Sequence, residues 1–297
     1  MTTLTEAFEH LAAPPTPDPS MTIHLFDSAS TLSKPLAPAW ETRDYLARGE
    51  IRGLNTDRFR AVYQIGSNAL SLLDHERREA IYWMSDARDI APYERGAPLR
   101  ALLHWWTSRH HMQMAHAAAV GNARGGVVLA GKGGLGKSTA ALACLEAGML
   151  YAGDDYVLLC DAPSPFVYSL YNSAKIDSAS AARFPRLSPF IINRERAEDE
   201  KAVLFLRDTE KAVAGFPLRA LLAPRVTRTG KTKVEKISAI EGLKALAPST
   251  IFQLPGAGRS AFDLLARLAR QLPCFRIDLG SDVEEIPAVI EKLLSEI

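Results

Sequence analysis

Residues 125–148, GGVVLAGKGGLGKSTAALACLEAG, decide the fold of this chain. The apolar run at residues 126–130 predicts a buried strand. Residues 138–147 are rich in alanine and leucine and predict a helix, which Gly148 is placed to end. A glycine-rich loop joins the two. Strand, loop and helix in this order indicate an α/β core.

The loop fits the pattern G-x-x-x-x-G-K-[ST], with Gly131, Gly136, Lys137 and Ser138 at the fixed positions. Such a loop directs backbone N–H groups and the positive end of a helix at one point, where phosphate binds. Lys137 would reach the β- and γ-phosphates of ATP, and Ser138 would bind Mg²⁺. The predicted nucleotide-binding residues are Gly131, Lys132, Gly133, Gly134, Leu135, Gly136, Lys137, Ser138 and Thr139.

Lys132 leaves a second interpretation open. An extra lysine at this place resembles the deviant Walker A loop of partitioning and septum-placing ATPases, where it reaches the nucleotide of a partner subunit. In that family the loop usually lies near the N-terminus and the next aspartates come much later. Here about 130 residues precede the loop, and Asp154 and Asp155 follow Lys137 by only 17 and 18 residues.

A histidine is predicted at the entrance of the loop. Residues 112–120 form an expected strand and residues 121–125 a turn. In a hairpin centred between Ala123 and Arg124, paired residue numbers sum to 247 and His116 faces Gly131. Adjacent strands lie only about 4.8 Å apart. A register shifted by one residue would turn His116 to the other face of the sheet.

Asp154 and Asp155 are expected at the same edge of the sheet. Residues 149–152 predict a strand parallel to the loop strand and beside it, in a βαβ unit whose carboxyl end opens where ligands bind. Neighbouring residues of an extended chain point in opposite directions, so one carboxylate can face the γ-phosphate while the other orients a metal. A carboxylate beside His116 could accept a proton from an attacking hydroxyl. An acid pair on its own is more typical of an exposed turn.

Three elements together, HAAAV at 116–120, GKGGLGKS at 131–138 and AGDDYVLL at 152–159, resemble the HPr kinase/phosphorylase superfamily. The resemblance covers about residues 112–161. It implies a P-loop core of the HPr kinase C-terminal-domain type with a mixed sheet. It also implies His116 and Lys137 in the active site, Ser138 as a Mg²⁺ ligand and Asp155 as the base that deprotonates an acceptor serine.

The chain departs from that family in two motifs. It lacks the E-[IV]-R-G-[LI]-G-I-I stretch that supplies a metal-ligating glutamate, for which Glu198 and Glu200 are the substitutes to test. It also lacks the V-P-V-R-P-G-like loop tied to phosphorolysis. The sequence is more similar to shorter, divergent members, some of which phosphorylate serine in ribosomal peptides such as lasso peptides. Residues 171–176 and 249–258 are then candidate acceptor or nucleotide contacts.

Composition excludes several other functions. The 297 residues carry a formal charge of +1, and the densest basic run, 225–233, is explained by a solvated hairpin, so no nucleic-acid partner is expected. No apolar run is long enough for a membrane span. The chain's three cysteines, Cys144, Cys160 and Cys274, lie far apart in apolar segments and are expected to be buried thiols in a cytoplasmic protein.

The predicted organisation has three parts: a flexible tail at 1–20, a β-rich N-terminal region at 21–111, and a P-loop kinase domain at 112–297. The N-terminal region is expected to hold a strand at 22–26, an antiparallel meander over 59–65, 69–73 and 79–84, and a helix at 96–111, whose Trp105 and Trp106 pack in the core.

The predicted function is transfer of the γ-phosphoryl group of ATP to a hydroxyl, most readily a serine of a peptide or protein. The predicted catalytic residues are His116, Lys137, Asp154 and Asp155, with Ser138 and Asp154 as metal ligands. A kinase of a small metabolite and a nucleotide-driven switch ATPase remain as alternatives, and assembly into a homo-oligomer is left open.

Overall fold

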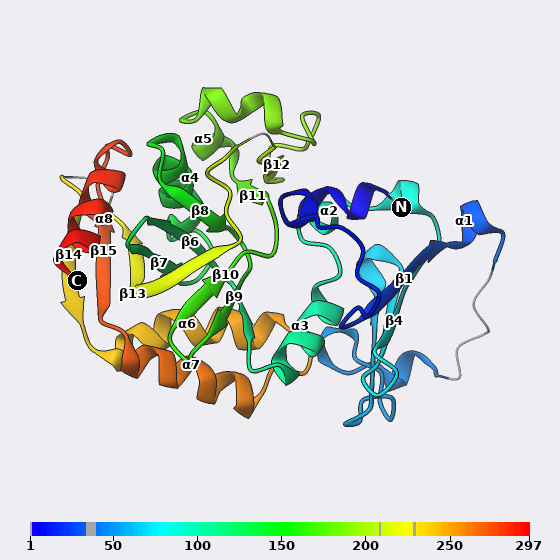
Figure 1. Cartoon of the computed structure of the whole chain (residues 1–297). Helices are drawn as coiled ribbons and strands as arrows, with labels where there is room; N and C mark the ends of the chain where they lie inside the picture. The colour runs from blue at the N-terminus through cyan, green and yellow to red at the C-terminus, as the bar shows by residue number, and fades with distance from the viewer. Residues whose placement is uncertain (1, 34–39, 208, 228–229) are drawn as a thin grey trace.

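A nine-stranded mixed sheet forms the centre of the protein (Figure 1). The computed structural model describes residues 2–33, 40–207, 209–227 and 230–297. Strands follow one another in the order β5-β9-β10-β13-β7-β6-β8, and β15 pairs with both β13 and β14. Their bounds are β5 Gln113–Ala115, β6 Ala117–Asn122, β7 Gly125–Ala130, β8 Leu150–Gly153, β9 Val157–Cys160, β10 Phe166–Tyr168, β13 Gly215–Val226, β14 Lys233–Ile237 and β15 Cys274–Leu279.

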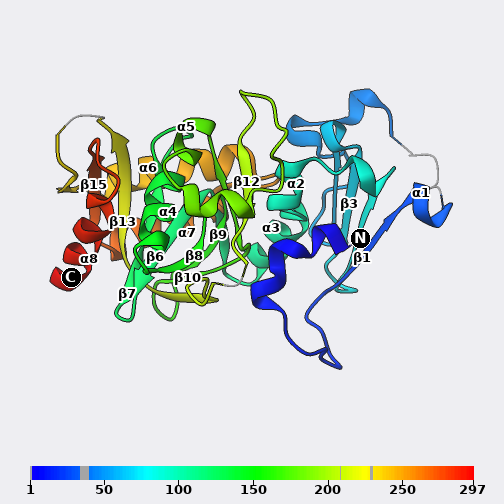
Figure 2. The same cartoon turned by 90° about the horizontal axis from the view of Figure 1, so that it is seen from above.

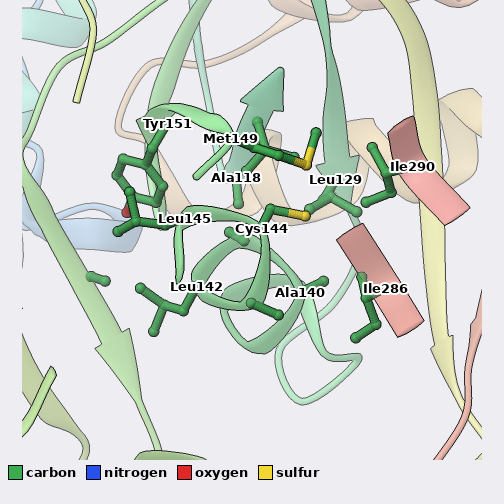
Figure 3. Packing of buried hydrophobic residues seen from close by; sticks show 14 of the residues in the cluster. Ala118, Leu129, Ala140, Leu142, Cys144, Leu145, Met149, Tyr151, Ile286 and Ile290 are labelled. Atoms are coloured by element: carbon green, nitrogen blue, oxygen red, sulfur yellow. The ribbon is translucent and has the colours of Figure 1, made fainter. Parts of the chain in front are cut away.

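Helices cover both faces of this sheet, which gives three layers. The helices α4 (Lys137–Glu146) and α8 (Glu285–Glu296) lie on one face, and α6 (Ala239–Gln253) and α7 (Arg259–Gln271) lie on the other (Figure 1). Successive side chains of a strand point to opposite faces of a sheet, so alternate residues of the central strands pack into the two cores. On the α4 side, Leu129 packs among apolar side chains of both helices (Figure 3). The prediction of an α/β fold is confirmed.

The predicted hairpin register is confirmed. Strands β6 and β7 are antiparallel, with Ala117 opposite Ala130 and Asn122 opposite Gly125, so paired numbers sum to 247 as expected. The expected single strand at 112–120 is nevertheless interrupted. At His116 the chain passes from β5, which pairs with β9, to β6, which pairs with β7. The N–H of His116 leaves the ladder and donates to Thr250 Oγ1 of α6 at 3.1 Å.

The predicted position of β8 is wrong. It does not lie beside β7, because β6 and β13 already occupy the two sides of that strand. Instead β8 pairs antiparallel with β6. Since β6 is antiparallel to both β7 and β8, these two strands still run in the same direction. Their carboxyl ends therefore meet at one edge of the sheet, as the functional prediction requires.

A second sheet of four strands, in the order β1-β4-β3-β2, forms the N-terminal region. Its strands β1 and β3 lie at the opposite end of the molecule from α8 (Figure 2). The predicted antiparallel meander of β2 (Phe59–Gln64), β3 (Ala69–Asp74) and β4 (Glu79–Met84) is confirmed, whereas β1 (Thr22–Asp27) runs parallel to β4. The predicted helix at 96–111 is confirmed as α3 (Arg100–Arg109), and a separate short helix, α2 (Pro92–Gly96), precedes it. Trp105 is buried in the core of this region, and Trp106 packs against it.

The beginning of the chain is not a loose tail. Residues 2–11 form the short helices η1 (Thr2–Leu4) and η2 (Glu6–Leu11). Leu4 and Ala7 are fully buried, and Glu6 pairs with Arg95 at 2.8 Å. Buried apolar surface and an ion pair to α2 dock this segment, contrary to the prediction. Residues 12–20 are exposed.

The remaining elements are short. Strands β11 (Ser173–Ile176) and β12 (Ala202–Phe205) form a two-stranded sheet. The basic run 225–233 is not a hairpin, because β15 lies between β13 and β14, and its residues 228–229 fall outside the described part. The other helices are α1 Ser28–Thr31, η3 Thr42–Asp44, η4 Ala47–Gly49, η5 Ile65–Ser67, η6 Ala87–Asp89, α5 Ser178–Ala181 and η7 Pro185–Phe190.

Two further predictions concern composition. Cys144, Cys160 and Cys274 are all free and buried, as predicted. Within the described residues, no helix has the length and apolar character that crossing a membrane requires.

Candidate active site

A cavity of about 790 Å³ opens at the sheet edge where β7 and β8 end. His116, Asp154 and Asp155, which the sequence analysis placed at this edge, all line it. The glycine loop, residues 131–136, and the start of α4 contribute Gly133, Gly134, Gly136, Lys137, Ser138 and Thr139. Of the predicted loop residues, Gly131, Lys132 and Leu135 are not among the lining residues of this cavity. Lys132 is exposed.

The glycine loop runs from the end of β7 to the start of α4. Strand β7 ends at Ala130, and α4 begins at Lys137. Gly136 has a φ of 92°, and a Cβ at this position would lie 2.4 Å from Leu279 Cδ1, so only glycine fits. Lys137 Nζ donates to the carbonyl oxygens of Gly131 at 2.8 Å and of Lys132 at 3.1 Å. The lysine ammonium is thus held against the loop itself.

Asp155 contacts nitrogen atoms of two side chains. Its Oδ1 lies 3.2 Å from His116 Nε2, and its Oδ2 accepts from Lys175 Nζ at 2.7 Å. Burial raises the pKa of the Asp155 carboxyl, but the Lys175 ammonium and the His116 imidazole outweigh it and hold the pKa well below its usual range. Asp155 has a φ of 68°, which is uncommon for a residue other than glycine. Asp155 is therefore an ionised carboxylate in a fixed orientation.

Asp154 has a different environment. It is 1% exposed, and its Oδ2 accepts from the backbone N–H of Lys175 at 3.3 Å. Its Oδ1 is buried without a hydrogen-bond partner among the described residues. Burial, followed by the charge of Asp155, raises the pKa of Asp154, and the Ser138 hydroxyl partly offsets this effect. A buried carboxylate oxygen without a partner is a place where a cation would be stabilised.

The oxygen donors of the cavity fit the needs of Mg²⁺. This ion is commonly bound by one or two protein oxygens together with phosphate oxygens and water. Asp154 Oδ1 and the Ser138 hydroxyl meet that need, and in the described part of the chain no group of three histidine, cysteine, aspartate or glutamate side chains gathers to hold a metal. Glu198 and Glu200 are exposed and are not among the lining residues, so neither takes the role considered for it.

Several residues of the cavity were not predicted from the sequence. Lys175 belongs to the segment 171–176, but nothing in its spacing showed that it meets Asp155. Tyr156 lies against the His116 ring at a centroid distance of 5.6 Å and donates to Gln253 Oε1 at 2.8 Å. Arg100 lies 3.5 Å from the Tyr156 hydroxyl and pairs with buried Glu94 at 3.2 Å. These residues come from segments far apart in the chain, which local patterns cannot bring together.

The two candidate contact segments reach the cavity only in part. From residues 171–176, Lys175 and Ile176 line it, whereas Tyr171 is buried and donates to the carbonyl oxygen of Pro98 at 2.8 Å. From residues 249–258, Gln253 lines it. The others are not among its lining residues, although Thr250 receives the N–H of His116.

The chain is similar to solved structures but has no match among family models or curated proteins. Among solved structures, the Hpr(Ser) kinase/phosphatase from Coxiella burnetii is similar, with 12% identity and a TM-score of 0.33, over 62% of this chain and 95% of that chain. So low a score carries no functional argument, which has to come from the site itself.

Proposed function

We propose that this protein is a Mg²⁺-dependent kinase that transfers the γ-phosphoryl group of ATP to a hydroxyl, with serine of a peptide or protein as the preferred acceptor. The observation that carries the proposal is the meeting of His116, Asp154 and Asp155 with the glycine loop in one cavity. An oriented carboxylate beside the loop is what removal of a proton from an acceptor hydroxyl requires. The ionised Asp155, fixed by His116 at 3.2 Å, supplies the acceptor for a hydroxyl proton.

The charges of the cavity suit a triphosphate. Its lining carries five cationic side chains against three carboxylates, an excess that favours a polyanion. The cations are Arg100, Lys137, Lys175, Arg183 and Lys201, and the carboxylates are Asp154, Asp155 and Asp177. The cavity volume of about 790 Å³ lies within the usual range for ligand sites.

The residues of the chain divide the work of transfer. As the acceptor oxygen bonds to the γ-phosphorus, its proton passes to Asp155, and the bond from the γ-phosphorus to the bridging oxygen breaks with its electrons leaving on ADP. Lys137 and the loop N–H groups stabilise the negative charge on the phosphate oxygens. His116 keeps the Asp155 carboxylate in place. Asp154 and Ser138 would hold Mg²⁺, which neutralises phosphate charge when bound.

The test is incubation of the protein with ATP, Mg²⁺ and whole-cell extract, followed by mass spectrometry for a new phosphoserine-containing product. Free serine and candidate peptides with labelled ATP serve as defined acceptors. A phosphorylated peptide that disappears with Asp155→Asn supports the proposal. Phosphorylation of free serine or another small alcohol alone would instead favour the alternative of a metabolite kinase.

A further inference from the structure

Lys175 contacts both of the adjacent aspartates, each through a different group. Its backbone N–H donates to Asp154 Oδ2 at 3.3 Å, and its ammonium donates to Asp155 Oδ2 at 2.7 Å. One residue on β11 therefore fixes the relative placement of the two adjacent carboxylates.

The side chain of Lys175 is held in place along its length. Only 12% of it is exposed, so its ammonium has exchanged most of its water for the Asp155 carboxylate. Its Cε lies beside Gly96 of α2, where an added Cβ would come within 3.3 Å of it and within 2.8 Å of Val203. The absence of a side chain at Gly96 leaves the room through which Lys175 passes to the cavity.

We propose that Lys175 is a positioning residue that assigns the two aspartates to different tasks. Its ammonium holds Asp155 as a proton acceptor and keeps a divalent cation away from it. Asp154 receives only the backbone N–H and retains a buried Oδ1 without a partner among the described residues, so the cation binds there. Without this lysine, each of the two carboxylates would be open to a divalent cation of its own. The role of Asp155 as a proton acceptor rests on the proposed kinase function. The binding of the cation at Asp154 and not at Asp155 does not rest on it.

Cation binding gives the first test, and it needs no turnover. Mn²⁺ bound to the protein with a non-hydrolysable ATP analogue is counted by electron paramagnetic resonance. Lys175→Met should raise the count from about one to about two per chain, because Asp155 then becomes free to bind metal. Lys236→Met, which removes the same charge from an exposed site on β14, is the matched control and should leave the count unchanged. An unchanged count in Lys175→Met overturns the sorting.

Chemical restoration of the ammonium gives the second test. Lys175→Cys should lower kcat about 100-fold while the KM for ATP changes little. Aminoethylation of the introduced thiol with bromoethylamine rebuilds a lysine-like side chain and should restore kcat. The chain's own cysteines are buried, and burial raises the pKa of Cys144 to about 12, so they react poorly. Treated wild-type protein is the control.

The outcomes separate this inference from the proposed function. If wild-type protein transfers no phosphoryl group to any acceptor, the kinase proposal fails, while the Mn²⁺ count still decides whether Lys175 sorts the cation. If wild-type protein is an active kinase and aminoethylated Lys175→Cys stays inactive although folded by thermal unfolding, the positioning role fails. If Lys175→Cys raised only the KM for ATP and left kcat unchanged, the positioning role would also be overturned.

Discussion

The two groups of residues that meet in the cavity are built in opposite ways. The glycine loop and the start of α4 form one continuous segment, residues 131–139, whose conformation follows from glycines and a helix start. The carboxylate cluster, which we define as His116, Asp154, Asp155 and Lys175, comes from three segments and has its partners in contact only after folding. The loop is suited to bind phosphate, whereas the cluster is suited to move a proton.

This difference separates binding from transfer. Lys137 and Asp155 can be changed separately, because Lys137 donates to the loop carbonyls while Asp155 contacts His116 and Lys175. Variants in the loop should therefore weaken both nucleotide binding and turnover. Variants of His116, Asp155 or Lys175 should lower turnover and spare nucleotide binding.

Asp155→Asn is expected to have the largest effect on transfer. An amide cannot accept the hydroxyl proton, so the transfer rate should fall about 10²–10⁴-fold. The dissociation constant of a fluorescent ATP analogue should change by less than about threefold, since no loop contact is altered. Asp263→Asn, an exposed carboxylate on α7, is the control. Full transfer by Asp155→Asn would show that another group accepts the proton.

Lys137→Ala should come next and should affect both steps. Removing one charged donor from the transferring phosphate typically lowers turnover about 10²–10³-fold. Nucleotide affinity should also fall, which isothermal titration calorimetry measures. If Lys137→Ala bound ATP as tightly as the wild type and lowered only kcat, Lys137 would act in transfer and not in nucleotide binding. The separation between a binding loop and a transfer cluster would then be wrong.

How much the sequence could predict follows the same division. The hairpin register, the loop and the presence of His116 and Asp155 at one edge depend on short spacings, and these were predicted from residues 112–155. The interruption at His116 was not, because it depends on Thr250, which lies 134 residues away and takes the histidine N–H.

The other features that were not predicted from the sequence also depend on residues far away in the chain. Strand β8 was placed beside β7 because nothing in its residues shows that β6 and β13 occupy both neighbouring positions. Lys175 could not be assigned, since the four-residue strand β11 carries no pattern that directs it to Asp155. The docking of residues 2–11 depends on partners such as Arg95, which composition cannot identify.

The two adjacent aspartates should have opposite effects on stability without ligands. Loss of the buried Asp155–Lys175 pair should cost about 3–5 kcal/mol, so Asp155→Asn lowers the melting temperature at pH 7. Asp154→Asn should raise it, by on the order of 1 kcal/mol in unfolding free energy, because it removes a buried charge whose Oδ1 has no partner among the described residues. Calorimetry of both variants measures this difference.

The contribution of each carboxyl to folding stability should change with pH, and the sign of the contribution differs between the two. The folded pKa of Asp155 is lowered, so its contribution is present above the unfolded pKa of about 4 and is lost as pH falls toward the folded pKa. The folded pKa of Asp154 is raised, so its ionisation costs stability at high pH, and the cost disappears below about pH 4. If Asp155→Asn and Asp154→Asn both lowered the stability at pH 7, the opposite effects predicted for the two aspartates would be wrong.

Lys132→Ala should have the smallest effect, and it decides between the kinase and the switch. Lys132 is exposed and does not line the cavity, so in a kinase its removal should change kcat/KM by less than about threefold. In a switch of the partitioning kind, the same lysine would act on the nucleotide of a partner subunit. Its removal would then abolish both ATP hydrolysis and ATP-dependent dimerisation, which light scattering detects. Such a loss would show that the protein works as a switch, through an interface between the loops of two subunits and not through the carboxylate cluster.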